Sequence, residues 1–177
     1  MTEKNLLAGF KFFSDAAPDA LEMIAQKGEV LELEPEDVIF HYKEPAEHFY
    51  GLLKGEVDLS IVFTDSVLKT DIEYEESIQA SLVEEEKWIV VDTVYPGQVF
   101  GWASLVGPGH RTVTAQCTEP SRVIAIPAAE LKTMLADDHS LGYMIMTKLS
   151  NIISNRLKVR TDKLIETWVE AFDTDKI

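Results

Sequence analysis

The sequence predicts a mainly β fold with flanking helices: an eight-stranded antiparallel jelly-roll β-barrel followed by a long C-terminal helix. About eight short apolar segments, several alternating with polar residues, are separated by turn-forming residues between positions 31 and 127. The last quarter of the chain instead repeats apolar residues at helical spacing. A chain of 177 residues is long enough for one ordinary core. We expect residues 1–137 to form the N-terminal helix and the barrel, and residues 138–177 to form the long helix and a tail.

The chain is first expected to form one helix and four short strands. Pro18 suits the first turn of the helix, Leu21 and Ile24 lie at helical spacing, and Gly28 ends it. The segments that follow alternate apolar and polar residues, or hold short apolar runs between turns, which is typical of strands. We expect these strands at residues 31–34, 38–40, 49–53 and 57–63.

A strongly acidic segment at residues 64–87 interrupts the strand pattern. Its Asp and Glu residues outnumber its two lysines. We interpret it as an acidic loop or extended hairpin that lies in solvent, and a docking face for a basic partner is the alternative. The strand before it is expected to place alternate residues on one face: Val57, Leu59, Ile61 and Phe63.

Strand signals return after this segment and complete the predicted barrel. Residues 88–95, 99–101, 112–117 and 121–127 alternate or are apolar, with Gly and Pro turns between them. The alternation at 112–117 places Val113, Ala115 and Cys117 on one face, so Cys117 is expected to be a small core residue.

Two helices are expected at the C-terminal end. Pro127 begins the first, and Asp138 caps the second and longer one. Because the apolar stripe on this longer helix is more than one small domain can bury, a parallel helix-pair homodimer is expected. Leu141, Ile145, Leu149, Ile152 and Leu157 form this stripe, and Leu164, Trp168 and Phe172 extend it.

Composition excludes several functions for the chain. The net charge of -15 argues against nucleic acid or an anionic membrane as a partner, because both need clustered cations. One cysteine, no secretory signal and no apolar run long enough to span a bilayer favour the reducing cytoplasm. No nucleophile elbow, Ser-His-Asp order or phosphate-binding Walker loop is present, so we expect no enzyme activity.

The segment with the most specific chemistry runs from Gly97 to Ala115. A strand, a glycine turn and a short helix (97–105) are followed by a strand that begins with Arg111 and Thr112. Free N–H groups at the start of a helix attract an anion, which a guanidinium and a hydroxyl can also reach. The alternative from the residues alone is a tight structural corner with a surface arginine.

This segment resembles the phosphate-binding cassette of cyclic-nucleotide-binding domains, the sensor fold of the catabolite activator protein and of cyclic-nucleotide-regulated kinases. The resemblance covers residues 13–160 and includes segments 28–30, 37–40, 46–50 and 53–57. It implies a regulatory sensor domain whose ligand is a cyclic nucleotide (cAMP or cGMP) or another small anion. By this resemblance the candidate ligand-binding residues are Phe100, Gly101, Trp102, Ala103, Ser104, Arg111, Thr112, Arg160 and Thr161.

One position departs from the family's pattern. The family's cassette has a glutamate after the Phe-Gly pair, where it accepts the ribose hydroxyl, and this chain has Trp102. An indole N–H only donates, so Trp102 cannot replace that acceptor. Trp102 could plug the pocket, stack on a different planar ligand or pack outward. The resemblance also implies that the long helix forms the dimer interface and contacts the base, at Arg160 and Thr161.

Three functions remain open from the sequence. The first is a dimeric sensor of a phosphate-bearing small molecule, and the second is a ligand-free dimeric scaffold for a protein partner that the sequence does not identify. The third, a cupin-like metal enzyme using His41, Glu44 and His48, is disfavoured because no two histidines lie two apart, so no metal site is expected. After Thr161 the chain has only a short acidic tail, so we expect no DNA binding.

Overall fold

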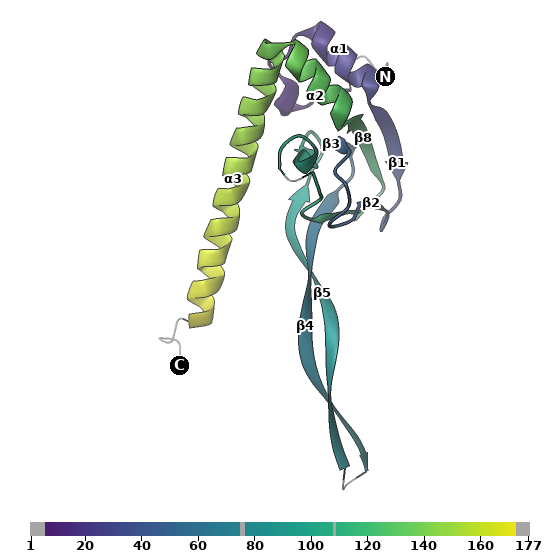
Figure 1. Cartoon of the computed structure of the whole chain (residues 1–177), viewed down its shortest axis with the longest axis vertical. Helices are drawn as coiled ribbons and strands as arrows, with labels where there is room; N and C mark the ends of the chain where they lie inside the picture. Colours follow the sequence, from purple (N-terminus) through teal and green to yellow (C-terminus); the bar gives the residue numbers. More distant parts are fainter. Residues whose placement is uncertain (1–5, 75–76, 108, 173–177) are drawn as a thin grey trace.

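The computed structural model describes residues 6–74, 77–107 and 109–172, and describes side chains in these ranges outside residues 65–85. Two antiparallel four-stranded sheets form the body of the molecule, with strand orders β1-β8-β3-β6 and β2-β7-β4-β5 (Figure 1). The predicted mainly β jelly roll with a long C-terminal helix is confirmed, although the two sheets do not close into one barrel. The strands are β1 Glu29–Leu33, β2 Val38–Phe40, β3 His48–Lys54, β4 Val57–Tyr74, β5 Ser77–Val94, β6 Val99–Phe100, β7 Thr114–Cys117 and β8 Ser121–Pro127.

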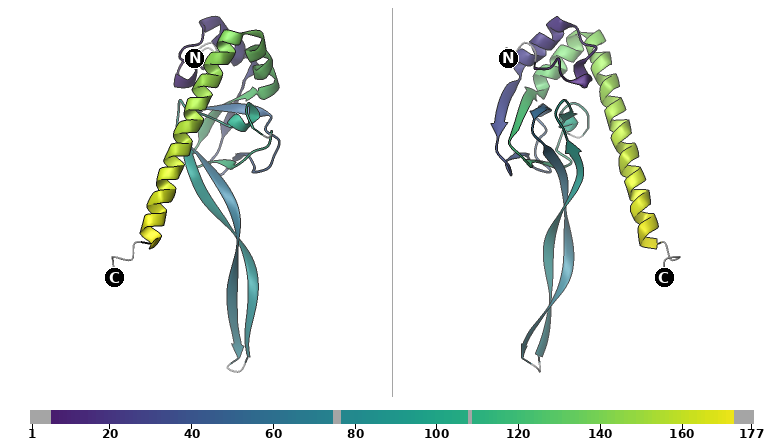
Figure 2. Two further views of the ribbon diagram at one scale, coloured as in Figure 1. Left: turned by 60° about the vertical axis from the view of Figure 1, so that its left-hand side comes forward. Right: turned by 180° about the vertical axis from the view of Figure 1, so that it is seen from behind.

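The helices cover the outer face of the first sheet. They are the 3-10 helix η2 (Lys11–Phe13), α1 (Pro18–Lys27), α2 (Ala128–Asp137) and α3 (His139–Phe172). Pro18 stands in the first turn of α1 and Gly28 caps its end, as predicted. Figure 2 shows the three α-helices gathered at one end of the roll, from which α3 alone extends along the molecule.

Strands β3 and β8 of the first sheet are buried on both faces, and this explains the nearly continuous apolar run of β3. Phe49 and Ile124 face the helices, in one cluster with Ile24, Leu131 and Ile145. The other faces of β3 and β8 meet the second sheet, where the buried residues are Phe40, Tyr50, Leu52, Leu59, Phe100, Ala115, Cys117 and Val123. The predicted inward position of Cys117 is therefore confirmed.

The strand at 112–117 is shorter than predicted, because β7 begins at Thr114. Thr114 was expected on the outer face but is buried, and its hydroxyl oxygen accepts a hydrogen bond of 3.0 Å from the Tyr42 amide. The segment that contains Tyr42 therefore covers a residue that the alternating pattern placed on the outer face of the strand.

The acidic segment at 64–87 continues a pair of long strands, so the extended hairpin is the correct one of the two predicted forms. β4 and β5 pair from Val57 with Val94 to Tyr74 with Ser77. The resulting ribbon projects far beyond the roll, toward the same end of the molecule as α3 (Figures 1 and 2). Where the hairpin leaves the roll, Phe63 is 41% exposed, so the predicted apolar face of this strand is buried only at its start.

The fully buried residues of helix α3 all lie in its N-terminal half. The Asp138 carboxylate accepts hydrogen bonds of 3.0 Å from the amides of Ser140 and Leu141, which confirms the predicted cap. Gly142 permits close packing on α2, since a Cβ there would lie 2.5 Å from the Leu135 carbonyl oxygen. The buried stripe continues through Leu141, Ile145, Leu149 and the partly buried Ile152.

The predicted continuation of that stripe to Leu157 is wrong. Leu157 is 66% exposed, because five residues after Ile152 it has turned about 140° away around the helix. Leu164, Trp168 and Phe172 are exposed as well, and they align with Leu157 on a second face. No helix among the described residues is long and apolar enough to cross a membrane.

Candidate functional site: the cassette corner and its arginines

The predicted cassette is a tight corner at the end of β6. Gly101 has a φ of 73° and caps the 3-10 helix η3 (Trp102–Ser104). A Cβ at Gly101 would lie 2.8 Å from Tyr50 Cδ2 and 2.9 Å from Arg111 Nη1. Both the left-handed backbone and the lack of space therefore require glycine at this position.

Arg111 holds this corner together from inside the roll. Its side chain is only 3% exposed, and it donates hydrogen bonds to two backbone carbonyl oxygens, from Nη1 to Gly101 (3.0 Å) and from Nη2 to His48 (2.8 Å). The guanidinium carbon lies 4.1 Å from the Phe40 ring centroid and 5.3 Å from that of Tyr50. Arg111 therefore joins β3, the cassette and the inter-sheet core.

The charge of Arg111 is buried without a counter-ion. Among the described residues, no carboxylate lies within salt-bridge distance of it, and its Nε has no hydrogen-bond partner. Burial lowers the pKa of Arg111, and the Tyr50 phenol and the Glu44 carboxylate oppose that shift. A buried cation held by carbonyl dipoles and aromatic faces, without a carboxylate in contact among the described residues, is a site that an anion would stabilise.

A second buried polar atom of the cassette also lacks a partner. Ser104 is 1% exposed, and its hydroxyl oxygen forms no hydrogen bond within the described part of the chain. Buried polar groups without partners are rare in native proteins and call for a specific explanation, such as a ligand or a bound water.

Helix α3 is tied to the cassette by Arg156. Its guanidinium lies 4.7 Å from the Trp102 ring centroid, and its Nε is 2.9 Å from Asp92 Oδ2 on β5. The two charged side chains are 16% and 28% exposed, so solvent screens this pair less than a surface pair. Burial lowers the pKa of Arg156, Asp92 opposes the shift, and the nearby charge of Arg160 adds to it. We call these contacts the Arg156 strap.

The hollow between the cassette and α3 is small. Its volume is about 30 Å³, whereas sites for small organic ligands commonly measure about 300–1,000 Å³. In this conformation a nucleotide does not fit. The lining residues are Phe40, Leu59, Gly101, Trp102, Ala103, Arg111, Thr112, Val113, Arg156 and Arg160.

Six of the nine predicted site residues line this hollow, and three do not. Phe100 is fully buried in the inter-sheet core, and Ser104 is buried but does not line the hollow. Thr161 is exposed, and its hydroxyl donates a hydrogen bond of 2.9 Å to the Leu157 carbonyl oxygen. The six lining residues are Gly101, Trp102, Ala103, Arg111, Thr112 and Arg160.

Sequence reasoning assigned no role to Arg156. The signal was present, because Arg156 precedes Arg160 by one helical turn and so shares its face. Trp102 lines the hollow and also packs against the core cluster beneath the helices. Its partly buried indole thus forms part of the wall that leaves so little space.

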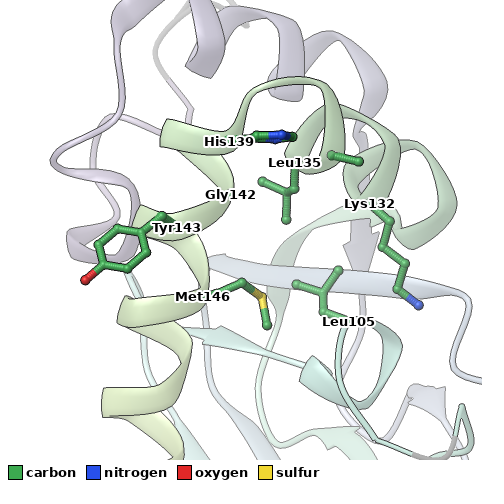
Figure 3. Close-up of a pocket in the computed structure, with 8 residues that line it drawn as sticks. Leu105, Lys132, Leu135, His139, Gly142, Tyr143 and Met146 are labelled. Atoms are coloured by element: carbon green, nitrogen blue, oxygen red, sulfur yellow. The ribbon is translucent and has the colours of Figure 1, made fainter.

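A larger hollow of about 340 Å³ lies at the corner of α2 and α3, beside the end of the cassette (Figure 3). Leu105, Leu135 and Met146 point into it, whereas the Tyr143 ring points away. Its lining is mostly apolar, so this hollow is poorly suited to a phosphate. Within the described ranges no three His, Cys, Asp or Glu residues are grouped as a metal site would require.

Comparison with known proteins adds sequence and structural relatives. The family model for the cyclic nucleotide-binding domain matches residues 77–138. No curated protein matches the sequence. A crystal structure of a candidate cyclic nucleotide-binding protein from Geobacter metallireducens GS-15 is 26% identical, with a TM-score of 0.65, and the match covers 89% of this chain and 98% of that one.

Two further solved structures share the fold at lower identity. A cyclic nucleotide-binding domain from Methylobacillus flagellatus KT is 16% identical, with a TM-score of 0.66 and coverage of 93% of this chain and 83% of that one. The sensor domain of the transcriptional regulator DNR from Pseudomonas aeruginosa is 20% identical, with a TM-score of 0.59 and coverage of 88% and 91%.

Proposed function

We propose that this chain, which belongs to the cyclic nucleotide-binding domain family, is a non-enzymatic regulatory sensor that binds a phosphate-bearing small molecule at its cassette. The observation that carries the proposal is the buried guanidinium of Arg111, which has no counter-ion in contact among the described residues and an Nε without a partner. Arg156 and Arg160 line the same hollow, whereas Asp92 is the one carboxylate paired with them in the described structure. The excess of positive charge favours an anion.

We infer the mechanism of the sensor from the small volume of the cassette hollow. A ligand larger than a water molecule requires Trp102 and the Arg156 strap to move, because they close the hollow of about 30 Å³. Since Arg156 belongs to α3, binding would favour a conformation in which α3 is displaced from the roll. A ligand shifts such an equilibrium only by its difference in affinity for the two conformations.

The ligand is a cyclic nucleotide (cAMP or cGMP) or another small anion, with phosphate as the recognised group. Arg111 and Thr112 supply donors on one side of the hollow, and Arg160 lies on the other. Trp102 offers no acceptor for a ribose hydroxyl. We therefore expect weaker discrimination between a cyclic nucleotide and other phosphates than a cassette with an acidic residue would give.

The responding element is proposed to be a homodimer formed through α3. Apolar residues project from residues 157–172 of this helix, in which every side chain is exposed. An isolated helical segment of this length is marginally stable in water, so a second copy that covers this face would stabilise it. The exposed residues are Leu157 (66%), Leu164 (67%), Ile165 (56%), Trp168 (57%) and Phe172 (67%). We propose that the chain acts on an unidentified protein partner in the cytoplasm and does not bind DNA.

Thermal unfolding in the presence of cAMP, cGMP or inorganic phosphate tests the sensor. At 100 times the dissociation constant, a ligand stabilises the fold by about 2.7 kcal/mol, which for a chain of this size raises the melting temperature by about 5–10 °C. Arg160→Ala should reduce the shift, because Arg160 lines the hollow, is exposed and can be removed without loss of packing. Lys158→Ala is the matched control, since Lys158 is an exposed cation of α3 that does not line the hollow.

A ligand-free dimeric scaffold is the second candidate function. The volume of about 30 Å³ and the two internal hydrogen bonds of Arg111 favour it, because a vestigial cassette would close in this way. It predicts no thermal shift with any of the three compounds. A shift that Arg160→Ala leaves unchanged would also argue against the proposed cassette site.

A further inference from the structure

The largest of the three hollows lies on the other side of α3 from the exposed apolar face, and it is separate from the cassette hollow. It has a volume of about 540 Å³, which is within the usual range for small-molecule sites. Five of its lining residues occur at positions i, i+3, i+4, i+7 and i+8 of α3, which places them on one helix face. They are Lys148, Asn151, Ile152, Asn155 and Arg156.

The remaining walls come from two segments far apart in the sequence. Lys11 and Phe12 of η2 form one wall. The turn between β5 and β6, with β6 itself, forms the other through Gly97, Gln98 and Val99. Apolar side chains of Phe12, Val99 and Ile152 thus alternate with polar groups around one cavity.

Two basic residues of α3 close the ends of this cavity. Lys148 Nζ is 2.7 Å from Asp15 Oδ2 and donates hydrogen bonds to Ser14 Oγ (2.9 Å) and the Lys11 carbonyl oxygen (3.3 Å). At the other end stands the Arg156 strap. Eight residues separate Lys148 and Arg156, which is about 12 Å along a helix.

The charge of the lining is opposite to that of the chain. The whole chain has 31 acidic and 16 basic residues, yet the lining contains three basic residues and no acidic one. Asp15 and Asp92 pair with Lys148 and Arg156 but are not part of the lining. Between the cations, the carboxamides of Asn151 and Asn155 offer both donors and acceptors.

We propose that this cavity is a second ligand site, which binds a small organic anion with an apolar body, such as an aryl phosphate. The apolar walls would hold the body of the ligand, and Arg156 with the carboxamides of Asn151 and Asn155 would hold its anionic group. The site does not depend on the function proposed for the cassette. It stays accessible in a dimer formed through the exposed face of α3, because Asn155 lies about 160° around the helix from Leu157.

This site also has a physical link to the cassette. Arg156 lines both hollows and is the residue that straps α3 to Trp102 and Asp92. An anion that attracts Arg156 in the second site competes with Asp92 for its guanidinium. Occupation of the second site is therefore expected to alter the strap that closes the cassette.

Titration of the ¹⁵N-labelled full chain with phenyl phosphate tests this inference, with benzylamine as a probe of similar shape and opposite charge. Saturable shifts are expected at the amides of Gly97, Gln98 and Val99 and at the side-chain amides of Asn151 and Asn155. Benzylamine should produce none of them. The inference is wrong if phenyl phosphate does not bind in the millimolar range, if benzylamine binds equally well, or if the shifts are confined to the cassette or to the exposed face of α3.

Two variants with the same charge change separate the site from a general effect of charge. Asn155→Glu adds a carboxylate inside the cavity and should weaken phenyl phosphate binding by about tenfold or more. Ser154→Glu adds the same charge at the neighbouring exposed position, which does not line the cavity, and should have a much smaller effect. Equal weakening by both variants would overturn the assignment.

Discussion

Replacing Arg111 tests whether this residue stabilises the fold in addition to being a candidate ligand contact. In Arg111→Ala the carbonyl oxygens of Gly101 and His48 lose their hydrogen bonds from Arg111 at 3.0 and 2.8 Å, although the Gly101 oxygen still accepts the Ser104 amide at 3.2 Å. The aromatic faces of Phe40 and Tyr50 lose the cation stacked on them. A small cavity also forms in a region where Arg111 is 3% exposed.

The size of the effect follows from these losses. A hydrogen bond from a charged donor contributes about 1.5–3 kcal/mol, and the loss of two such bonds exceeds what is regained by removing an unpaired buried cation. We expect a loss of about 2–4 kcal/mol in the free energy of unfolding. For a chain of this size, that corresponds to a fall in melting temperature of about 10 °C.

Urea unfolding followed by tryptophan fluorescence measures the change. Arg160→Ala is the control, because Arg160 is exposed and should change the free energy of unfolding by about 0.5 kcal/mol or less. Arg111→Lys should fall between the two, because an ammonium lacks the planar fork that reaches both carbonyls. If Arg111→Ala and Arg160→Ala have equal stability, Arg111 does not hold the corner and our interpretation of its burial is wrong.

Three further predictions address the ligand, the dimer and the buried thiol. Trp102→Glu adds an acceptor at the cassette and should raise the affinity for cAMP by about tenfold without raising the affinity for inorganic phosphate. Calorimetry measures both affinities. An equal gain for both ligands would contradict the role assigned to this position. If the proposed homodimer forms through α3, Leu164→Glu should give a monomer in sedimentation velocity, whereas Lys163→Glu on another face of the helix should not. Burial raises the pKa of the Cys117 thiol, so less of the reactive thiolate is present near neutral pH. Iodoacetamide should therefore label Cys117 far more slowly in the folded chain than in urea. Similar labelling rates would show that the core opens. Because the thiol's pKa is higher in the folded state, its contribution to stability is complete below about pH 8.5 and is lost as the pH rises through the folded pKa.

The fold could be predicted from the sequence wherever one face of an element is buried. Alternation at 57–61 and 113–117, the turn residues between strands and the cap at Asp138 determined the order of elements. The extent of the hairpin could not be fixed, because an acidic ribbon that leaves the core carries no burial pattern. Leu157 was misassigned because the rotation of about 100° per residue amounts to about 140° between Ile152 and Leu157, which moves Leu157 off the buried face.

The residues of the site could be predicted from the sequence, but their arrangement in space could not. The resemblance to the cyclic-nucleotide-binding cassette identified Gly101, Trp102, Arg111 and Arg160 as candidate residues of one site, and all four line one hollow. It could not show that Arg111 would turn inward to two carbonyl oxygens, because that rotamer depends on where His48 and Phe40 stand in other strands. The helical spacing placed Arg156 on the face of Arg160, but its ion pair with Asp92 could not be predicted, because Asp92 lies on a strand far away in sequence.

The Arg111 Nε–H resonance is the most direct probe of the central claim, because this N–H has no acceptor among the described residues. In ¹⁵N spectra of the full chain recorded during titration with cAMP and with inorganic phosphate, we predict a saturable downfield shift of this resonance with at least one of the two. The same titration should move the Arg156 Nε–H as the strap opens. An Arg111 resonance that stays in place at saturating concentrations of both would contradict anion sensing at the cassette.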